Sequence, residues 1–291
     1  MAKKLFCELS PLTYRISTQK EIALRHLRDL PLRGRFAQEK SQEALPVRVY
    51  RHSSLIRRRL GNIDMRLQEN KAVNLSLAAP KVDHLLIRPG EIFSFWRLVG
   101  NPTARAGYRE GLVIASGRTG QGIGGGMCQF TNLIHWMVLH SDLTIIERHH
   151  HNGVDLFPDF GRVIPFGTGT SILYNYLDYR FRNDTSATYQ LIIYTSGEYL
   201  HGELRCDRRP ERIYHIQCRN QFFSQEADGI YRNNQIYRLT VDAQTGVTLG
   251  EEEIGRNHAK IAYDPEGLEL VDRVGQKNLR PFCKADVPEG A

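Results

Sequence analysis

Hydrophobic and polar positions change their pattern twice along the 291-residue chain, which divides it into three regions. In residues 1–66, apolar side chains recur at roughly helical spacing among many charges, and prolines and glycines interrupt the pattern. This pattern predicts short, basic, partly amphipathic helices that pack against the rest of the protein. The positions that carry the prediction are Ile22, Leu24, Leu27 and Leu30, with Leu55 and Leu60 flanking an arginine cluster.

The middle region, residues 67–183, alternates apolar runs with glycine-rich sequence. Residues 70–86 are apolar and helix-prone, although Pro80 must start, end or kink an element. A Pro-Gly turn then leads into a short predicted strand over residues 92–96. The long glycine-rich loop that follows ends in Gly124-Gly125-Gly126-Met127-Cys128-Gln129.

A buried helix is predicted directly after this loop. Its apolar side chains fit the i, i+3, i+4, i+7, i+8 template of an amphipathic helix, and two more extend the apolar surface nearly all the way round. These positions are Phe130, Leu133, Ile134, Met137 and Val138, extended by Trp136 and Leu139. Residues 143–148 are then predicted as a strand that runs into His149, His150 and His151, and residues 170–181 as another strand.

The third region, residues 184–291, is predicted to be rich in β-strands. Runs of strand-forming residues separated by turn signals are expected at 189–194, 199–204, 213–217, 236–241 and 246–249. A hairpin turn is expected at residues 242–245, and the last ten residues are expected to be loose. The three regions together predict an α+β protein.

The composition is that of a soluble globular protein, 41% hydrophobic and 24% charged. No stretch approaches the roughly 18 apolar residues that span a bilayer. The N-terminus begins like a signal peptide, but Glu8 and Pro11 interrupt it, so we expect a chain that is not exported and is cytoplasmic. The five cysteines are widely spaced, which favours reduced thiols, with Cys206 and Cys218 as the one plausible bridge.

The net charge of +7 is concentrated in residues 1–66, which contain 15 Lys and Arg against 6 Asp and Glu. Such a surplus can hold a protein on an anionic lipid surface, and an ordinary solvated surface is the alternative. The densest cluster, Arg57-Arg58-Arg59, lacks the interleaved aromatic residues of a single-strand binder. Peripheral contact with an anionic membrane is therefore an expected partner interaction, and binding to nucleic acid is not.

The residue with the clearest chemical potential is Cys128, in the first turn of the predicted helix and directly after three glycines. Free N–H groups and the helix dipole favour a thiolate there, and the thiolate is the nucleophilic form. Glycines allow a substrate to approach the backbone, whose N–H groups could stabilise an oxyanion. A histidine at the end of the next strand, from the group 149–151, would supply the base.

One alternative to this chemistry remains open, and two others are disfavoured. Cys128 can be a small buried residue where a helix packs closely, with the glycines present for steric reasons. A zinc site is disfavoured because Cys128 and His135 are about 10 Å apart along the helix axis. A phosphate-binding loop is disfavoured because the Gly-Lys-[Ser/Thr] sequence is absent. No metal and no cofactor are expected.

At these residues the chain resembles the VanW family. The similarity covers residues 70–183 well and the β-rich remainder more loosely. The strings that carry it are residues 74–79, 88–100, 107–112, 124–129, 147–151 and 178–183. The family name implies an association with glycopeptide resistance and cell-wall biology, but it does not supply a reaction.

The resemblance also assigns functional positions. It places the family's cysteine on Cys128, its glutamine on Gln129, its arginine on Arg148, its histidine on His151 and a late aspartate on Asp178. One departure concerns an Asp-Ala-Thr-Val string found in many members, which here reads Gly-Thr-Ser-Ile at residues 169–172. If that aspartate orients the histidine, this chain uses another group, such as Asn152, Asp155 or Asp178, or lacks the activity.

The leading functional hypothesis is therefore a cysteine-dependent acyl-transfer or amide-cleaving enzyme with a papain- or transglutaminase-like core, in which a cysteine-bearing helix packs on an antiparallel sheet. Cys128 would be the nucleophile and His151 the base. Backbone N–H groups around Gly126 to Gln129, or the Gln129 side chain, would stabilise the oxyanion. Gly124, Gly125 and Gly126 would contact the substrate, a peptide or peptidoglycan precursor, and Arg148 would hold its acidic group. The alternative is a non-catalytic module that binds an anionic ligand or partner peptide at the glycine-rich loop and helix N-terminus.

Overall fold

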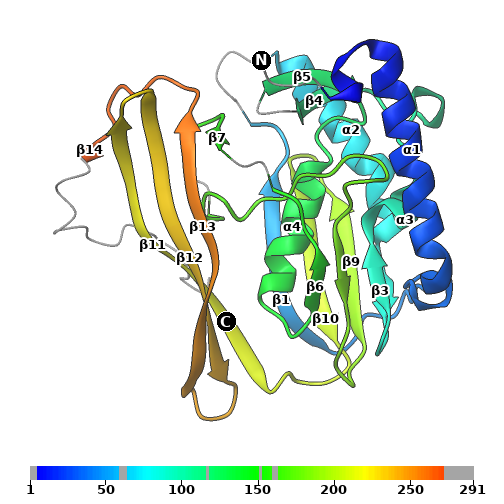
Figure 1. The fold of residues 1–291 in the computed structure, drawn as a ribbon. Coiled ribbons are helices and arrows are strands. Elements are labelled where there is room, and N and C mark those ends of the chain that lie inside the picture. The colour runs from blue at the N-terminus through cyan, green and yellow to red at the C-terminus, as the bar shows by residue number, and fades with distance from the viewer. Residues whose placement is uncertain (1–4, 59–63, 116–117, 151–152, 159–162, 272–291) are drawn as a thin grey trace.

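The computed structural model describes residues 5–58, 64–115, 118–150, 153–158 and 163–271, and its architecture is α+β (Figure 1). The α-helices are α1 (Pro11–Asp29), α2 (Met65–Val82), α3 (Phe95–Val99) and α4 (Cys128–Leu139), and the 3-10 helices are η1 (Phe6–Glu8), η2 (Leu30–Arg35) and η3 (Ala104–Ala106). The strands are β1 (Val47–Leu55), β2 (Leu85–Ile87), β3 (Ile92–Ser94), β4 (Glu110–Ala115), β5 (Arg118–Ile123), β6 (Thr144–Glu147), β7 (Val154–Asp155), β8 (Arg180–Arg182), β9 (Tyr189–Thr195), β10 (Tyr199–Cys206), β11 (Arg212–Glu226), β12 (Gly229–Asp242), β13 (Thr248–Ile261) and β14 (Leu270–Val271). Among these helices none has both the length and the apolar character to cross a membrane.

The central sheet is antiparallel with strand order β1-β10-β9-β2, so it takes strands from all three regions of the sequence. Helix α2 packs on β9, and α4 packs on β1 and β10. The approach of α4 is close at Gly202, where an added Cβ would lie 2.8 Å from the Cε of Met137. The predicted packing of the cysteine-bearing helix on an antiparallel sheet is thus observed. A papain- or transglutaminase-like core stays a prediction.

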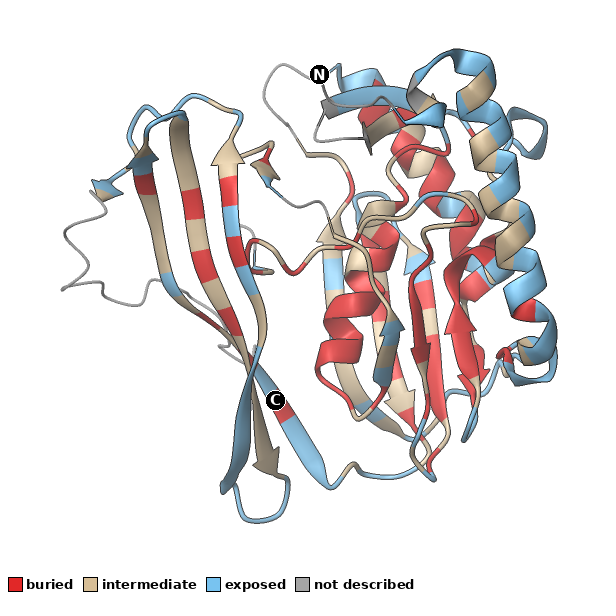
Figure 2. Cartoon of the chain, in the orientation of Figure 1, coloured by how far each residue is buried: buried red, intermediate tan, exposed pale blue. Residues whose placement is uncertain are grey.

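A second layer covers the other side of α4. Strands β11, β12 and β13 form a long antiparallel ribbon that stands beside the central sheet in Figure 1. Trp136 and Leu139 of α4 pack with Ile216, Cys218 and Ile236 of this ribbon in a hydrophobic cluster separate from the main core. Because it lies between sheet and ribbon, α4 is buried nearly all round, as its sequence predicted (Figure 2).

The N-terminal region differs from its prediction. It contains one long helix, α1, in place of several short ones, and residues 47–55 form strand β1, which was not predicted. Strand β1 is stabilised by antiparallel pairing with β10, far away in sequence, and this tertiary contact outweighs the local helix-like pattern. The expectation that this region packs against the rest of the protein is confirmed.

Three predictions in the middle region were wrong. The strand over residues 92–96 ends at Ser94, because the carboxylate of Asp178 accepts the Trp96 N–H at 3.1 Å and caps a new helix, α3. The long loop contains the β4–β5 hairpin, since its glycines sit inside strands that approach other backbone closely. The strand over 170–181 is reduced to β8, because the residues before it bind α4 instead.

The C-terminal region follows its prediction. Strands β9 to β13 cover the five expected runs, and the β12–β13 hairpin turns where it was expected. The last ten residues lie outside the described part of the chain. Cys206 and Cys218 both carry free thiols, so the one plausible disulfide is not formed.

The interface between α4 and the ribbon holds a cluster of titratable groups. His140 stacks on Tyr50 with 3.8 Å between ring centroids, and its Nδ1 lies 2.7 Å from the Trp136 carbonyl. Burial lowers the pKa of His140 to about 4, and the nearby His215, Arg238 and His52 act in the same direction. Burial likewise lowers the pKa of His52 to about 4.

These shifts predict acid-sensitive packing of the ribbon. A histidine with a folded-state pKa of about 4 contributes stability that is fully present above its unfolded pKa of 6.5 and is lost as the pH falls towards 4. Lowering the pH from 7 to 4.5 is expected to remove about 2–3 kcal/mol from the free energy of unfolding through His140 alone. Urea titrations should show a smaller pH effect in His140→Gln and an unchanged one in His201→Gln. Equal pH effects in all three proteins would contradict the assignment.

Candidate functional site

The glycine-rich loop before α4 is packed so closely that none of its three glycines could carry a side chain. A Cβ on Gly124 would lie 2.5 Å from the Cβ of Pro102, and one on Gly125 would lie 2.2 Å from the carbonyl carbon of Gly111. A Cβ on Gly126 would lie 2.3 Å from the Cγ of Lys71. Gly124 and Gly126 also adopt φ angles of +77° and +93°, which disfavour any other residue. The glycines therefore have a steric role.

The backbone N–H groups of these glycines are already used within the protein. Those of Gly124, Gly125 and Gly126 donate at 3.0 Å to the carbonyls of Arg109, Gly122 and Leu112. The N–H of Gln129 donates to the carbonyl of Gly126. Within the described chain, the N–H groups of Met127 and Cys128 have no carbonyl partner, and that of Cys128 is directed at its own thiol. These two are the donors that an incoming ligand could take over.

Cys128 is the first residue of α4 and is partly exposed. Burial of its thiol raises the pKa, and a backbone hydrogen bond from Ile172 acts in the opposite direction without outweighing it. The helix N-terminus thus does not by itself produce the lowered thiol pKa that the sequence suggested.

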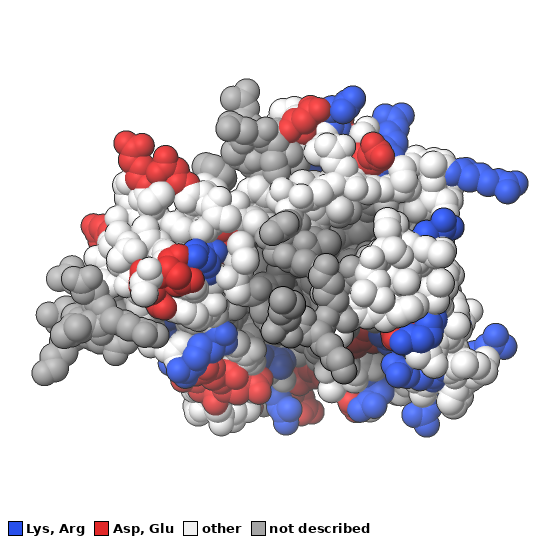
Figure 3. Space-filling model, turned by 45° about the horizontal axis from the view of Figure 1, so that its top comes forward, with Lys and Arg blue, Asp and Glu red and all other residues white. Residues whose placement is uncertain are grey.

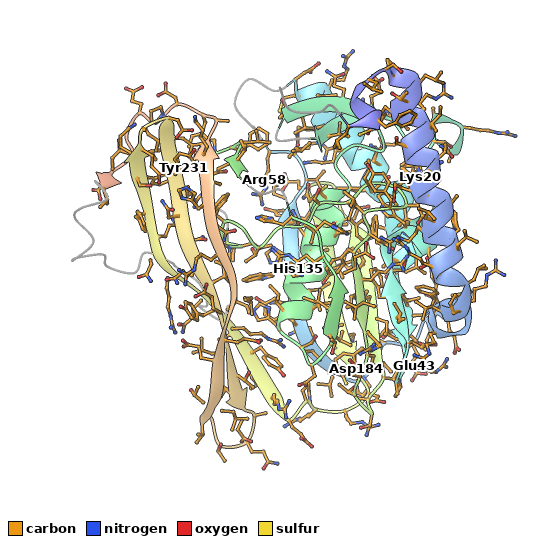
Figure 4. All side chains as sticks on the ribbon, in the orientation of Figure 1. Lys20, Glu43, Arg58, His135, Asp184 and Tyr231 are labelled. Atoms are coloured by element: carbon orange, nitrogen blue, oxygen red, sulfur yellow. The ribbon has the colours of Figure 1, made fainter. Side chains whose placement is uncertain are left out.

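Lys71 of α2 lies directly beneath this loop and was not singled out in the sequence. Its side chain is 7% exposed, and its methylene stem fills the space beside Gly126, two residues before Cys128. Burial lowers the pKa of the ammonium group to about 7, and Arg58 and Arg57 lower it further by repulsion. Arg58 lies near the start of α4 in Figure 4. Among the described residues, no carboxylate or other hydrogen-bond acceptor partners Lys71.

The same face of α2 anchors the loop through Asn74. Its amide donates to the carbonyls of Arg109 (3.0 Å) and Gly125 (2.9 Å), and its Oδ1 accepts the N–H of Arg109 at 2.8 Å. Asn74 is completely buried. These three bonds fix the loop, so the position of the Met127 and Cys128 N–H groups is set before any ligand arrives.

Gln129 binds the central sheet. Its amide donates to the Oγ of Ser54 at 2.8 Å and to the carbonyl of Leu55 at 2.9 Å, at the end of β1. These bonds occupy the amide N–H groups that a role in stabilising an oxyanion would require. The role of Gln129 in stabilising an oxyanion stays a prediction.

Arg148 holds the loop that covers Cys128. Its guanidinium donates to the carbonyls of Gly167 (2.8 Å) and Gly169 (3.1 and 3.2 Å), and it has no acidic partner among the described residues. Asn132 fixes the same loop by accepting the N–H of Thr170 at 2.7 Å. Gly169, the first residue of the Gly-Thr-Ser-Ile string, lies against α4. There is room for a side chain at this position, since an added Cβ would lie no closer than 3.5 Å to Asn132.

The groups proposed to orient the base lie in other environments. Asp178 is completely buried and accepts four hydrogen bonds, from Ser94 Oγ, Trp96 N, Tyr179 N and Arg180 Nε. Asp155 pairs with Arg232 at 3.4 Å and accepts the Tyr263 hydroxyl at 3.0 Å. His151 and Asn152 lie outside the described residues. The structure therefore describes Cys128 without its predicted base.

Other titratable groups near α4 do not form a metal site. His135 is completely buried, with its Nδ1 3.1 Å from the Tyr179 hydroxyl and no partner for Nε2. Across the described ranges, no group of three or more His, Cys, Asp or Glu side chains is arranged to hold a metal ion. The chemistry available here is an ammonium group, a thiol and two backbone donors.

Comparison with known proteins identifies the family. The family profile described as VanW like protein matches residues 70–205. The chain is 35% identical to "Vancomycin B-type resistance protein VanW" of Enterococcus faecalis (strain ATCC 700802 / V583) over 238 residues, 81% of this chain and 86% of that protein. The chain belongs to the VanW family. The resemblance predicted from the sequence is thus confirmed, and the relative's name associates the family with vancomycin resistance.

A second similarity is shorter. The chain is 30% identical to "Uncharacterized protein YoaR" of Bacillus subtilis (strain 168) over 118 residues, 40% of this chain and 36% of that protein. No solved structure matches the chain. The profile match contains α2 from residue 70 onward, the glycine-rich loop and α4, so Lys71 and Cys128 both lie in the part of the chain that resembles the family.

Lys71 was missed because the helix-prone segment 70–86 was predicted without asking which of its residues lie on the buried face. The signal was present: Leu67, Lys71, Asn74, Leu75 and Ala78 repeat at helical spacing, and all are buried. A lysine on the buried face of an amphipathic helix needs a partner or a function, because an unpaired buried charge is costly.

Proposed function

We propose that this VanW-family protein binds the anionic group of a cell-wall peptide precursor at the first turn of α4. The observation that carries the proposal is Lys71, a lysine that is 7% exposed, has no partner among the described residues and lies beside Gly126. An anion placed there would receive the N–H groups of Met127 and Cys128 and would neutralise the ammonium group.

Electrostatics supports an anion in preference to a neutral ligand. Lys71, Arg57 and Arg58 repel one another, and the helix N-terminus adds further positive potential. No carboxylate of the described chain offsets the charge of Lys71. A buried charge without a partner costs several kcal/mol of stability. A ligand carboxylate that pairs with Lys71 recovers much of that energy on binding.

The class of ligand follows from combining this site with the family. A relative named for vancomycin resistance makes a peptide precursor of the cell wall a suitable ligand. The C-terminus of such a peptide is a carboxylate. We therefore propose a peptide carboxylate as the group that is bound.

The test is calorimetric titration with N-acetyl-D-alanyl-D-alanine and with its C-terminal amide. Wild type should bind the acid and not the amide, and Lys71→Met should lose the binding. Lys81→Met, on the same helix but bonded to the Val99 carbonyl, should retain it. Because the pKa of Lys71 is about 7 before binding, affinity should weaken as the pH rises above 7. Equal affinity in wild type and Lys71→Met would overturn the proposal.

A second candidate is the cysteine-dependent acyl-transfer or amide-cleaving enzyme. The position of Cys128 favours it, since its thiol opens α4 beside the same two N–H donors that could stabilise an oxyanion. In this reading Cys128 attacks the carbonyl of the peptide, and His151 removes the thiol proton and returns it to the leaving group.

Alkylation by iodoacetamide separates the two candidates. Because burial raises the pKa of its thiol, Cys128 is expected to react more slowly than the partly exposed Cys7 at pH 7, as read by peptide mass spectrometry. A binding module should also tolerate Cys128→Ser. If Cys128 instead reacts faster than Cys7 at pH 6, and His151→Ala removes that advantage, the enzyme replaces the binding module as the proposed function.

A further inference from the structure

Helix α1 is attached to the protein through its polar face. Arg180 forms a two-bond ion pair with Asp29 at 2.7 and 2.8 Å, and both side chains are buried. Arg25 forms a second two-bond pair with Glu147, with both distances 2.6 Å, and also donates to the Tyr176 carbonyl. Amphipathic helices of globular proteins ordinarily do the reverse and bury their apolar face.

The apolar face of α1 is turned to the solvent. Leu12, Ile16 and Leu27 are 65%, 51% and 60% exposed, and Leu30, directly after the helix, is also exposed. At 100° per residue these four positions and Ala23 fall on one narrow stripe along the helix. Figures 1 and 2 show α1 at the outer edge of the molecule with its outward side exposed.

The segment before α1 extends this surface. Leu5, Phe6 and Leu9, in and beside η1, are 64%, 55% and 60% exposed. Single exposed apolar residues are common, but a continuous group over residues 5–30 marks an interaction surface. The inference below concerns this apolar face, defined by Leu5, Phe6, Leu9, Leu12, Ile16, Leu27 and Leu30.

Positive charge borders the apolar face. Arg15 and Lys20 on α1 and Arg33 and Arg35 in η2 are exposed, with Lys20 3.0 Å from Glu21, while Asp29 is buried against Arg180. Figure 3 shows Lys and Arg side chains gathered along the right-hand side of the molecule, on which α1 lies in Figure 1. An apolar stripe flanked by cations is typical of helices that lie in the interface of an anionic bilayer.

The charges also distinguish a lipid surface from a second copy of the chain. In a two-fold dimer through this face, each row of cations would approach the same row of its partner, and Lys20 would interrupt the dry contact. At a bilayer, arginine and lysine extend to the phosphate groups while the apolar side chains enter the acyl region. Anionic lipid therefore satisfies both the apolar and the charged parts of the surface.

We propose that the apolar face of η1 and α1 binds the protein peripherally to a bilayer rich in anionic lipid. The polar face of α1 stays fixed to the core by Asp29 and Arg25, so the helix lies flat on the membrane as part of the folded protein. This inference does not depend on the ligand proposed for Lys71.

The experiment is flotation of the full chain with vesicles of phosphatidylcholine alone or mixed with phosphatidylglycerol. Wild type should float with the anionic vesicles and not with the neutral ones, and high salt should release part of it. Leu12→Gln combined with Ile16→Gln should lower the bound fraction about tenfold or more, because two exposed apolar anchors are lost. Arg15→Gln with Arg33→Gln and Arg35→Gln should remove the preference for anionic lipid.

The control is Val247→Gln combined with Leu249→Gln, which removes two equally exposed apolar side chains from the β12–β13 hairpin and should leave flotation unchanged. Thermal unfolding of each variant checks that it is folded. Absence of flotation by wild type at low salt would overturn the proposal. So would a dimer, measured by light scattering, that Leu12→Gln and Ile16→Gln dissociate, because a second copy would then cover the face.

Discussion

An Asp178→Asn variant is expected to lose about 3–5 kcal/mol of its free energy of unfolding, one of the largest effects of any single substitution in the protein. Both carboxylate oxygens of Asp178 accept two donors: Oδ1 from Trp96 N and Tyr179 N, and Oδ2 from Ser94 Oγ and Arg180 Nε. An amide cannot accept at both positions, and it leaves the buried Arg180 with less compensating charge. Urea unfolding followed by circular dichroism measures the loss.

Asp184→Asn is the matched control. Asp184 also pairs with an arginine two residues away, Arg182, but both side chains are about 40% exposed. Its substitution should change stability by less than about 0.5 kcal/mol. The contrary result would be that Asp178→Asn unfolds at the same urea concentration as wild type but loses cleavage of the peptide. Asp178 would then act in catalysis, as the resemblance suggested, and the structural role argued from its four donors would be wrong.

Lys71→Met is expected to stabilise the ligand-free protein by about 3 kcal/mol at pH 7 while removing its ligand binding. The pKa of Lys71 is lowered to about 7, so the ammonium group is disfavoured in the folded state relative to the unfolded state. Methionine has a similar length, fills the same space beside Gly126 and carries no charge. Stabilisation on removing a functional residue is typical of binding sites whose electrostatics are unfavourable without ligand.

The pH dependence of this difference has a definite sign. A lysine whose pKa is lower in the folded state than in the unfolded state costs no free energy of unfolding above about pH 10.5. Stability is lost as the pH falls from there through 7, because the unfolded state then binds the proton more readily. The advantage of Lys71→Met over wild type should therefore shrink to below about 1 kcal/mol at pH 10. Lys81→Met, which loses a bond to the Val99 carbonyl, should be slightly destabilised at both pH values. Equal changes in the two variants would mean that Lys71 is paired.

The candidate site could be located from sequence but not interpreted. The glycine triplet and Cys128 are adjacent in the chain, so the turn and the start of α4 were predicted. What lies beneath the loop depends on α2, which approaches from residues about fifty positions earlier. The pattern of residues could not show that the side chain of Lys71 occupies the space where a Cβ of Gly126 would lie. Nor could it show that the N–H groups of the three glycines already donate hydrogen bonds within the protein.

The same limit applies to the fold. Strands β9 to β13 were predicted because local alternation and turn residues determine them. Strand β1 and the short helix α3 were not, because each depends on a distant partner: β10 supplies the pairing for β1, and Asp178 caps α3. Local pattern and tertiary contact agree in the ribbon and disagree in the parts of the core that surround the site.

The strand order of the central sheet also constrains when the protein can fold during synthesis. Strand β1 leaves the ribosome early, but its partner β10 begins only at Tyr199, and Arg180 must emerge before Asp29 is neutralised. Until then β1 has no partner strand, and the nascent chain exposes its unpaired edge. Pairing of β1 with β10 is therefore expected only late in synthesis, and chaperones or a lipid surface would meet α1 before the central sheet is complete.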